Sequence, residues 1–153
     1  MLYNKIMKNL KLNFEILPSG AFNNNLRTVL SKKAWDFIRK DAYVRYAHKC
    51  SICGAKPKRL EAHEVWSFDL STKTQTLEDV ISVCHLCHSV IHISRTQLIG
   101  EEDKAIVHFK KVNGVDFTAY TTALKQANLK NVELDKVDEW ALNLDWLKRY
   151  IND

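Results

Sequence analysis

All four cysteines of the chain fall into two closely spaced pairs, Cys50 with Cys53 and Cys84 with Cys87. Two C-x2-C pairs supply four thiolates, the donor set that a structural zinc ion takes in tetrahedral geometry. The alternative is two disulfides, but disulfides are typical of secreted proteins and would not explain the two-residue spacing inside each pair. The sequence therefore predicts one structural Zn²⁺ bound by these four cysteines.

Length and composition predict a single domain over residues 1–153. With 153 residues and 46% apolar side chains, the chain can form one hydrophobic core but is too short for two large domains. We expect a basic N-terminal strand and helix at 1–48, a zinc core at 49–95 and a helical part at 96–153.

The N-terminal part is expected to hold one strand and one helix. A short, mixed apolar stretch at 11–17 predicts a strand that ends at the turn residues Pro18 and Gly20. Ser31 is a good N-cap, and apolar residues three and four apart follow it, which predicts a helix to about Ala47.

The remaining pattern predicts an α+β fold with a small ββα core between the N-terminal elements and C-terminal helices. Strands are expected at 59–66 and 79–83, with a polar connection over 67–76. Helices are expected from the second cysteine pair through His92 and then at 101–112, 116–128 and 140–150.

Three histidines are expected to meet beside the zinc core. His63 lies in the first core strand, and His88 and His92 are four residues apart, a spacing that places two side chains on one helix face. Three imidazoles can bind a divalent cation such as Mg²⁺, Mn²⁺ or Ni²⁺, which polarises a phosphate and stabilises the leaving oxygen in phosphodiester hydrolysis. The other histidines, His48, His85 and His108, are interpreted as structural, with His85 as an alternative zinc ligand.

Positive charge is concentrated in the first part of the chain. Residues 1–60 contain 13 Lys and Arg against 3 Asp and Glu, whereas residues 61–153 contain 10 against 15. A positively charged face attracts nucleic acid by releasing counterions, whatever the base sequence. A solvated basic helix is the alternative interpretation. The candidate nucleic-acid contacts are Arg39, Lys40, Lys58, Arg59 and Arg95.

Together, three segments resemble an HNH endonuclease of the zinc-stapled, ββα-metal kind: Cys50-x2-Cys53, Leu60-Glu-Ala-His63-Glu64 and Val83-Cys84-x2-Cys87-His88-x3-His92. The resemblance is specific over about Lys49 to Ile93 and extends more loosely to a group of single-domain bacterial and phage HNH proteins. It implies metal-dependent cleavage of DNA, usually double-stranded. It also implies that a histidine activates water while histidines or an aspartate bind the cation.

The first core strand departs from the family pattern at the position of the general base. Family members usually have His-His or Asp-His there, with the first residue on the metal and the second as the base. Aligned on Leu60-Glu-Ala, His63 takes the metal position and Glu64 the base position. In the alternative register His63 is the base, and His88 and His92 are the principal metal ligands.

The second departure concerns the asparagine of the family pattern, which helps to fix the histidine loop. Spacing from the second cysteine pair suggests Glu78 or, as the closer match, Asp79. Either is an acidic substitute that can orient an imidazole or join the metal shell.

Two further classes of function compete with the nuclease. A catalytically weak or inactive HNH scaffold would bind nucleic acid or a protein partner, for example in phage defence or counter-defence, and the acidic C-terminal half favours it. A base-reading zinc finger is weaker, because the 30 residues between Cys53 and Cys84 do not fit a compact C2H2 finger.

The sequence predicts a cytoplasmic protein in a bacterium or a phage-infected host. Met1 to Asn13 lacks the continuous apolar core of a secretory leader, and no run approaches the roughly 18 apolar residues of a membrane span. No pattern indicates an oligomeric state.

Overall fold

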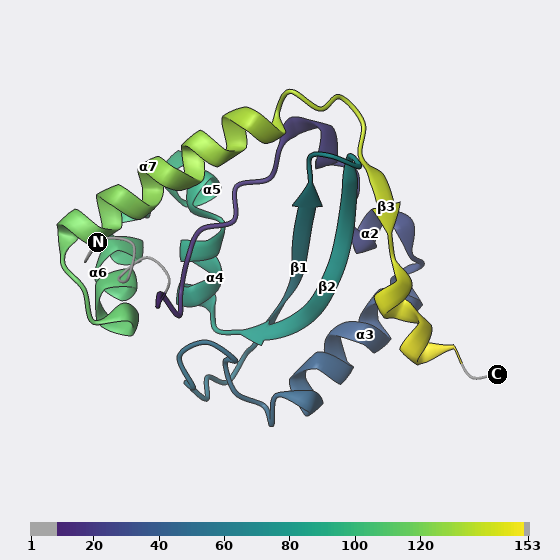
Figure 1. Cartoon of the computed structure of the whole chain (residues 1–153). Coiled ribbons are helices and arrows are strands. Elements are labelled where there is room, and N and C mark those ends of the chain that lie inside the picture. Colours follow the sequence, from purple (N-terminus) through teal and green to yellow (C-terminus); the bar gives the residue numbers. More distant parts are fainter. Residues whose placement is uncertain (1–8, 152–153) are drawn as a thin grey trace.

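The centre of the fold is a long antiparallel hairpin of β1 (Glu61–Asp69) and β2 (Thr74–Val83). The computed structural model describes residues 9–151 (Figure 1). Residues 1–8, which form most of the segment where no leader is expected, lie outside that range. A short strand, β3 (Ala141–Asn143), pairs in parallel with the start of β2 to give a mixed sheet of order β1-β2-β3. Helices pack on this sheet, so the predicted α+β class is confirmed.

Within the described residues, two α-helices precede the hairpin in the chain and four follow it. They are α2 (Leu26–Val29), α3 (Lys32–Arg45), α4 (His85–Ile91), α5 (Ile93–Leu98), α6 (Glu102–Asn113) and α7 (Phe117–Leu134), with short 3-10 helices η1 (Ser19–Ala21) and η2 (Asp145–Tyr150). The expected helix from Ser31 is confirmed, since the Ser31 hydroxyl accepts a hydrogen bond from the Ala34 N–H. No helix within residues 9–151 is long and apolar enough to cross a membrane.

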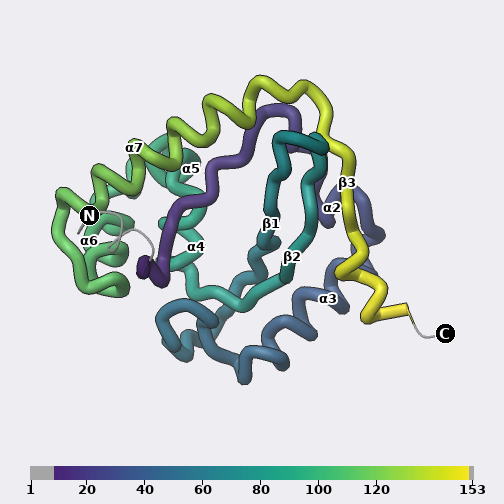
Figure 2. Tube along the Cα trace, viewed as in Figure 1, coloured from purple at the N-terminus to yellow at the C-terminus, as the bar shows by residue number. Residues whose placement is uncertain are grey.

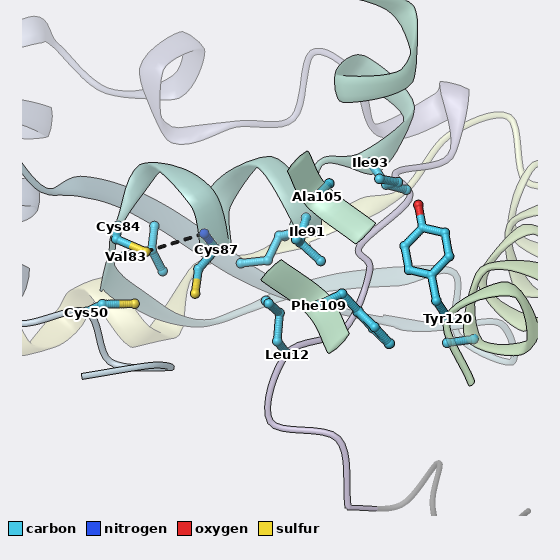
Figure 3. Close-up of a cluster of buried hydrophobic side chains, with 12 residues drawn as sticks. Leu12, Cys50, Val83, Cys84, Cys87, Ile91, Ile93, Ala105, Phe109 and Tyr120 are labelled. Carbon is cyan, nitrogen blue, oxygen red and sulfur yellow. Dashed lines mark hydrogen bonds between the residues drawn. The ribbon is translucent and has the colours of Figure 1, made fainter. Parts of the chain in front are cut away.

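Each face of the hairpin carries its own hydrophobic cluster, because successive strand residues point to opposite sides. Val80 packs with Trp66 and residues of α3, whereas Ile81 and Val83 pack with residues of α4, α6 and α7. Figure 2 shows the hairpin between α3 and α4. The hydrophobic cluster of Val83 also includes Leu12 from the N-terminal segment, residues 9–18. Figure 3 shows Leu12 beside Phe109. The division of the chain into three parts stays a prediction.

The expected polar connection at 67–76 is wrong, because the hairpin continues through most of it. Ser67 pairs with Thr76 and Phe68 with Gln75, so only residues 70–73 form the turn. Gln75 is fully buried, but its amide donates to the Asn24 carbonyl and accepts from the Asn24 side chain, both at 3.2 Å. A buried polar side chain with its hydrogen bonds satisfied is compatible with a strand that reads as polar in sequence.

The expected strand at 11–17 is also wrong, although this stretch is extended. Instead of pairing with a strand, Leu12 exchanges two hydrogen bonds with the Asn113 side chain, at 3.0 and 2.8 Å. The Glu15 N–H donates to the Ile91 carbonyl at 2.8 Å, and Phe14 stacks on Phe109 with ring centroids 5.2 Å apart. The apolar alternation of the stretch therefore serves packing on helices.

The expected helices of the C-terminal part are only partly correct. Helix α6 ends at Asn113, within one residue of the expected end, and is capped by Gly114 with a left-handed φ of 62°. Helix α7 begins after the Asp116 N-cap, close to the expected start, but continues to Leu134. The expected helix at 140–150 is replaced by β3 and η2. The Ala141 N–H donates to the Lys73 carbonyl at 2.9 Å, so the sheet edge competes successfully for this backbone.

Replacing Leu12 with Ala should destabilise the chain because Leu12 is fully buried where the N-terminal segment meets the zinc core. We expect a loss of about 2 to 5 kcal/mol in unfolding free energy, the range for buried Leu to Ala changes. Urea unfolding with zinc present measures it. Leu98→Ala is the matched control, since Leu98 is 87% exposed, and an equal loss in both variants would contradict this packing.

Candidate metal centres

The four cysteines form a compact cluster at the point where the hairpin enters α4. Their Sγ atoms all lie within 4.8 Å of one another, and those of Cys53 and Cys84 are 3.7 Å apart. All four are free of disulfides. A tetrahedral Zn²⁺ with bonds of about 2.3 Å separates its sulfurs by about 3.8 Å. The cluster is therefore consistent with the structural Zn²⁺ predicted from the sequence, and with a zinc-containing ββα core.

Main-chain hydrogen bonds shape both cysteine pairs. Gly54 adopts a left-handed φ of 77° and donates its N–H to the Cys50 carbonyl at 3.0 Å, which turns the chain tightly after the first pair. In the second pair the Cys84 Sγ caps α4 by accepting the Cys87 N–H at 3.4 Å, the dashed line in Figure 3. The Ser51 N–H donates to the Ser82 carbonyl at 2.8 Å and so ties the first pair to β2.

The shifted pKa values of the cysteines favour binding of a cation by the cluster. The hydrogen bond with Cys87 lowers the pKa of Cys50 to about 4, while the same contact raises the pKa of Cys87. Burial raises the pKa of Cys84 to about 11. Thiolates this close repel one another, so four of them coexist only around a positive charge.

The two histidines nearest the sulfurs differ in role. His108 Nε2 lies 3.1 Å from the Cys87 Sγ, and burial lowers the pKa of His108, so a neutral imidazole can donate its N–H to the thiolate. His85 is 77% exposed and its Nδ1 meets Glu61 at 2.9 Å. The four cysteines are all present in the cluster, so His85 is not needed as a substitute ligand. His48 lies in the turn after α3.

The second cluster consists of His63, His88 and His92. One ring nitrogen from each lies within 4.8 Å of the others, and the ring centroids are 4.7 to 5.4 Å apart. His63 comes from β1, on the strand face that packs on α4, and His88 from α4 itself. The helix ends at Ile91, so His92 lies in the junction with α5 rather than within one helix as expected.

The imidazoles of this cluster are suited to act as metal ligands. Burial lowers the pKa of His88, and burial together with His63 and His88 lowers the pKa of His92 to about 3. A neutral imidazole keeps one lone pair for a cation. Three imidazole donors suit transition-metal ions such as Zn²⁺ and Ni²⁺.

Two carboxylates that sequence reasoning missed contact this cluster. Glu61 accepts from His88 Nδ1 at 2.7 Å and from His85, and these hydrogen bonds outweigh burial and hold the pKa of Glu61 below its usual value. The Glu15 carboxylate lies 2.5 Å from His63 Nε2. Glu61 could have been found from its spacing, because residues two apart in a strand share a face. Glu15 lies 48 positions before His63, and no spacing rule identifies it.

The carboxylates predicted as catalytic residues form hydrogen bonds with parts of the chain other than the three histidines. Glu64 follows His63 in β1, accepts a hydrogen bond from the Leu26 N–H at the start of α2, and has its pKa raised by burial. Asp79 binds α3, accepting from the Tyr46 hydroxyl at 2.6 Å and from Arg45 at 3.2 Å. The alternative, Glu78, accepts from the Ser67 hydroxyl at 2.6 Å.

A cleft of about 750 Å³ opens over the three histidines. Glu15, Glu61 and Glu64 line it, and four arginines line it as well: Arg27, Arg39, Arg59 and Arg95. Arg39 is partly neutralised by Asp36 at 2.8 Å. Two of the predicted nucleic-acid contacts, Lys40 and Lys58, are exposed but do not line the cleft. Arg27 lines the cleft but was not among the predicted contacts.

No protein-family model, curated protein or solved structure matches the chain. The two clusters and the cleft are therefore the features of the chain that bear on function.

Replacing Cys53 with Ser should remove the structural zinc and the cooperative unfolding transition, because one of four ligands is lost. Zinc content is measured by mass spectrometry after a weak chelator has removed loosely bound ion. His85→Ala is the control and should keep about one zinc per chain, since His85 contacts Glu61 rather than the sulfurs. Zinc loss in the control would make His85 a ligand.

Proposed function

We propose that the chain is a metal-dependent endonuclease of the HNH kind, which hydrolyses phosphodiester bonds of DNA. The observation that carries the proposal is the meeting of His63, His88 and His92 at a cleft that arginines line. His63 comes from β1 and His88 from α4, which begins within the second cysteine pair, while His92 lies just after α4, an arrangement that supports a ββα-metal core.

In this proposal the three histidines bind the divalent cation. Glu61 holds His88 through Nδ1, which leaves Nε2 of that ring for the cation. A bound divalent cation polarises the phosphate and stabilises the leaving oxygen. The arginines of the cleft bind flanking phosphates, and Arg59 and Arg95 are exposed beside the histidines.

Glu64 is the proposed base that takes the proton of the attacking water. It shares the cleft with the histidines, and burial raises the pKa of its carboxyl group, the direction that suits a general base. Its hydrogen bond with the Leu26 N–H must lengthen or rearrange for this role, because that bond occupies one oxygen. Asp79 is not proposed as a catalytic residue, since Arg45 and Tyr46 engage it on the α3 side.

A binding module that holds DNA without cutting it is a second candidate. The Glu64–Leu26 contact favours it, because a carboxylate that serves as a helix cap is held away from water activation. Both functions require the basic cleft, but only the nuclease requires the three-histidine cluster.

The zinc-loaded chain should nick or linearise supercoiled plasmid with Mg²⁺, Mn²⁺ or Ni²⁺ and leave it intact with EDTA. His88→Ala should reduce the cleavage rate by at least about 100-fold, because the cation loses a ligand. His48→Ala is the control, since His48 lies in the turn after α3. If the plasmid stays intact with every ion while the chain still binds DNA, the nuclease proposal is wrong and the binding module is favoured.

Glu64→Gln and His63→Ala should separate the base from the ligands. Glu64→Gln should lose about 100-fold or more in cleavage rate while binding Ni²⁺ as the parent does. His63→Ala should lose both cleavage and Ni²⁺ affinity, measured by calorimetry. If His63→Ala keeps its Ni²⁺ affinity but cannot cleave, His63 rather than Glu64 is the base.

The double replacement of Arg59 and Arg95 by Ala should weaken DNA binding uniformly across base sequences. Each lost phosphate contact lowers the slope of log K against log salt by about 0.9 for duplex DNA. We therefore expect a slope smaller by about 2, measured by fluorescence anisotropy in EDTA. Lys130→Ala is the control, since Lys130 is exposed on α7. An unchanged slope would show that DNA does not bind at Arg59 and Arg95 of the cleft.

A further inference from the structure

The Glu15 carboxylate reaches the histidine cluster from a segment that is remote in sequence. In Figure 2 the N-terminal segment runs between α4 and the hairpin. The Glu15 N–H is bound to the Ile91 carbonyl at 2.8 Å, beside His92, and the carboxylate Oε2 lies 2.5 Å from His63 Nε2. His63 is only 4% exposed, so this contact is shielded from solvent.

We propose that Glu15 is a positioning residue that fixes the orientation and tautomer of His63. This proposal rests on the metal site of the proposed function. A neutral imidazole has one N–H and one lone pair, and a carboxylate can only accept. The contact therefore places the proton of His63 on Nε2 and the lone pair on Nδ1. A carboxylate bound to a ligand imidazole also makes that ligand more basic.

The side chain of Glu15 is not needed to hold its own segment in place. Leu12 is bound to Asn113, Phe14 stacks on Phe109, and the Glu15 main chain is bound to Ile91. Within the described residues the second carboxylate oxygen, Oε1, is buried and has no hydrogen-bond partner. The hydrogen bond with His63 is therefore the one that the Glu15 carboxylate makes within the described residues.

Glu15 and Glu61 each place a carboxylate against a different histidine of the cluster. Glu61 binds His88 through Nδ1 from the same strand as His63, and Glu15 binds His63 through Nε2 from outside the core. Glu78 and Asp79, the residues expected to orient an imidazole, bind Ser67 and Tyr46 instead. Glu15 makes the contact that those two residues do not make.

Ni²⁺ titration of the zinc-loaded chain of 153 residues tests the proposal without DNA. We expect Glu15→Leu to weaken Ni²⁺ binding about 10- to 100-fold, the usual effect of losing an outer carboxylate. Glu15→Gln should recover part of that loss, since an amide oxygen still accepts the Nε2 proton. Glu133→Gln removes the same charge from the exposed face of α7 and should leave Ni²⁺ affinity unchanged. Melting temperatures of all variants should match the parent.

Nitrogen-15 NMR of the imidazoles is the second measurement. In the parent without Ni²⁺, His63 should carry its proton on Nε2, and Glu15→Leu should populate the other tautomer. A parent with the proton on Nδ1 would overturn the proposal, as would Glu15→Leu with Ni²⁺ affinity within about twofold of the parent. An intact plasmid alongside the expected Ni²⁺ results would reject the nuclease and leave the role of Glu15 standing.

Discussion

The rest of the structure depends on four thiols that lie close enough together to bind one divalent cation. Cys50 and Cys53 lie before the hairpin, and Cys84 and Cys87 lie where β2 passes into α4, so the cluster brings both ends of the hairpin together. Because Cys84 caps α4 and Cys87 lies in its first turn, a zinc ion bound by this pair would also fix the rotation of that helix about its axis. His88 follows Cys87 directly, and its direction is therefore fixed by the zinc site. The four-cysteine cluster thus orients one member of the three-histidine cluster.

Hairpin register is the second constraint on the histidine cluster. Both faces of the hairpin are buried against helices, with Val80 in one hydrophobic cluster and Ile81 and Val83 in the other. A slip of one residue would move every side chain to the opposite face, which both cores oppose. The same alternation directs Glu61 and His63 towards α4. The two hydrophobic clusters, by fixing the register, thus direct His63 of β1 towards His88 and His92.

Much of this arrangement could be predicted from sequence because it depends on short spacings. The C-x2-C pairs, the four-residue separation of His88 and His92, and the N-cap Ser31 all act within a few residues. The failures involve long-range partners. The extended stretch at 11–17 packs on α6 through Phe14, and the stretch near Ala141 joins the edge of β2. Neither partner is marked by any local periodicity.

The same distinction explains which site residues the sequence could and could not identify. Every candidate ligand except His63 lies within four residues of another one in the chain. The groups that orient the ligands need not be close to them in sequence, because a hydrogen bond depends only on proximity in the fold. Glu61 is two residues from His63, but Glu15 is brought to His63 by a main-chain bond to Ile91 and by the packing of Leu12. Loss of the N-terminal segment would thus leave all three histidines in the chain but remove the carboxylate that holds one of them. The zinc core alone therefore carries the ligands of the second site without the full set of contacts that orients them.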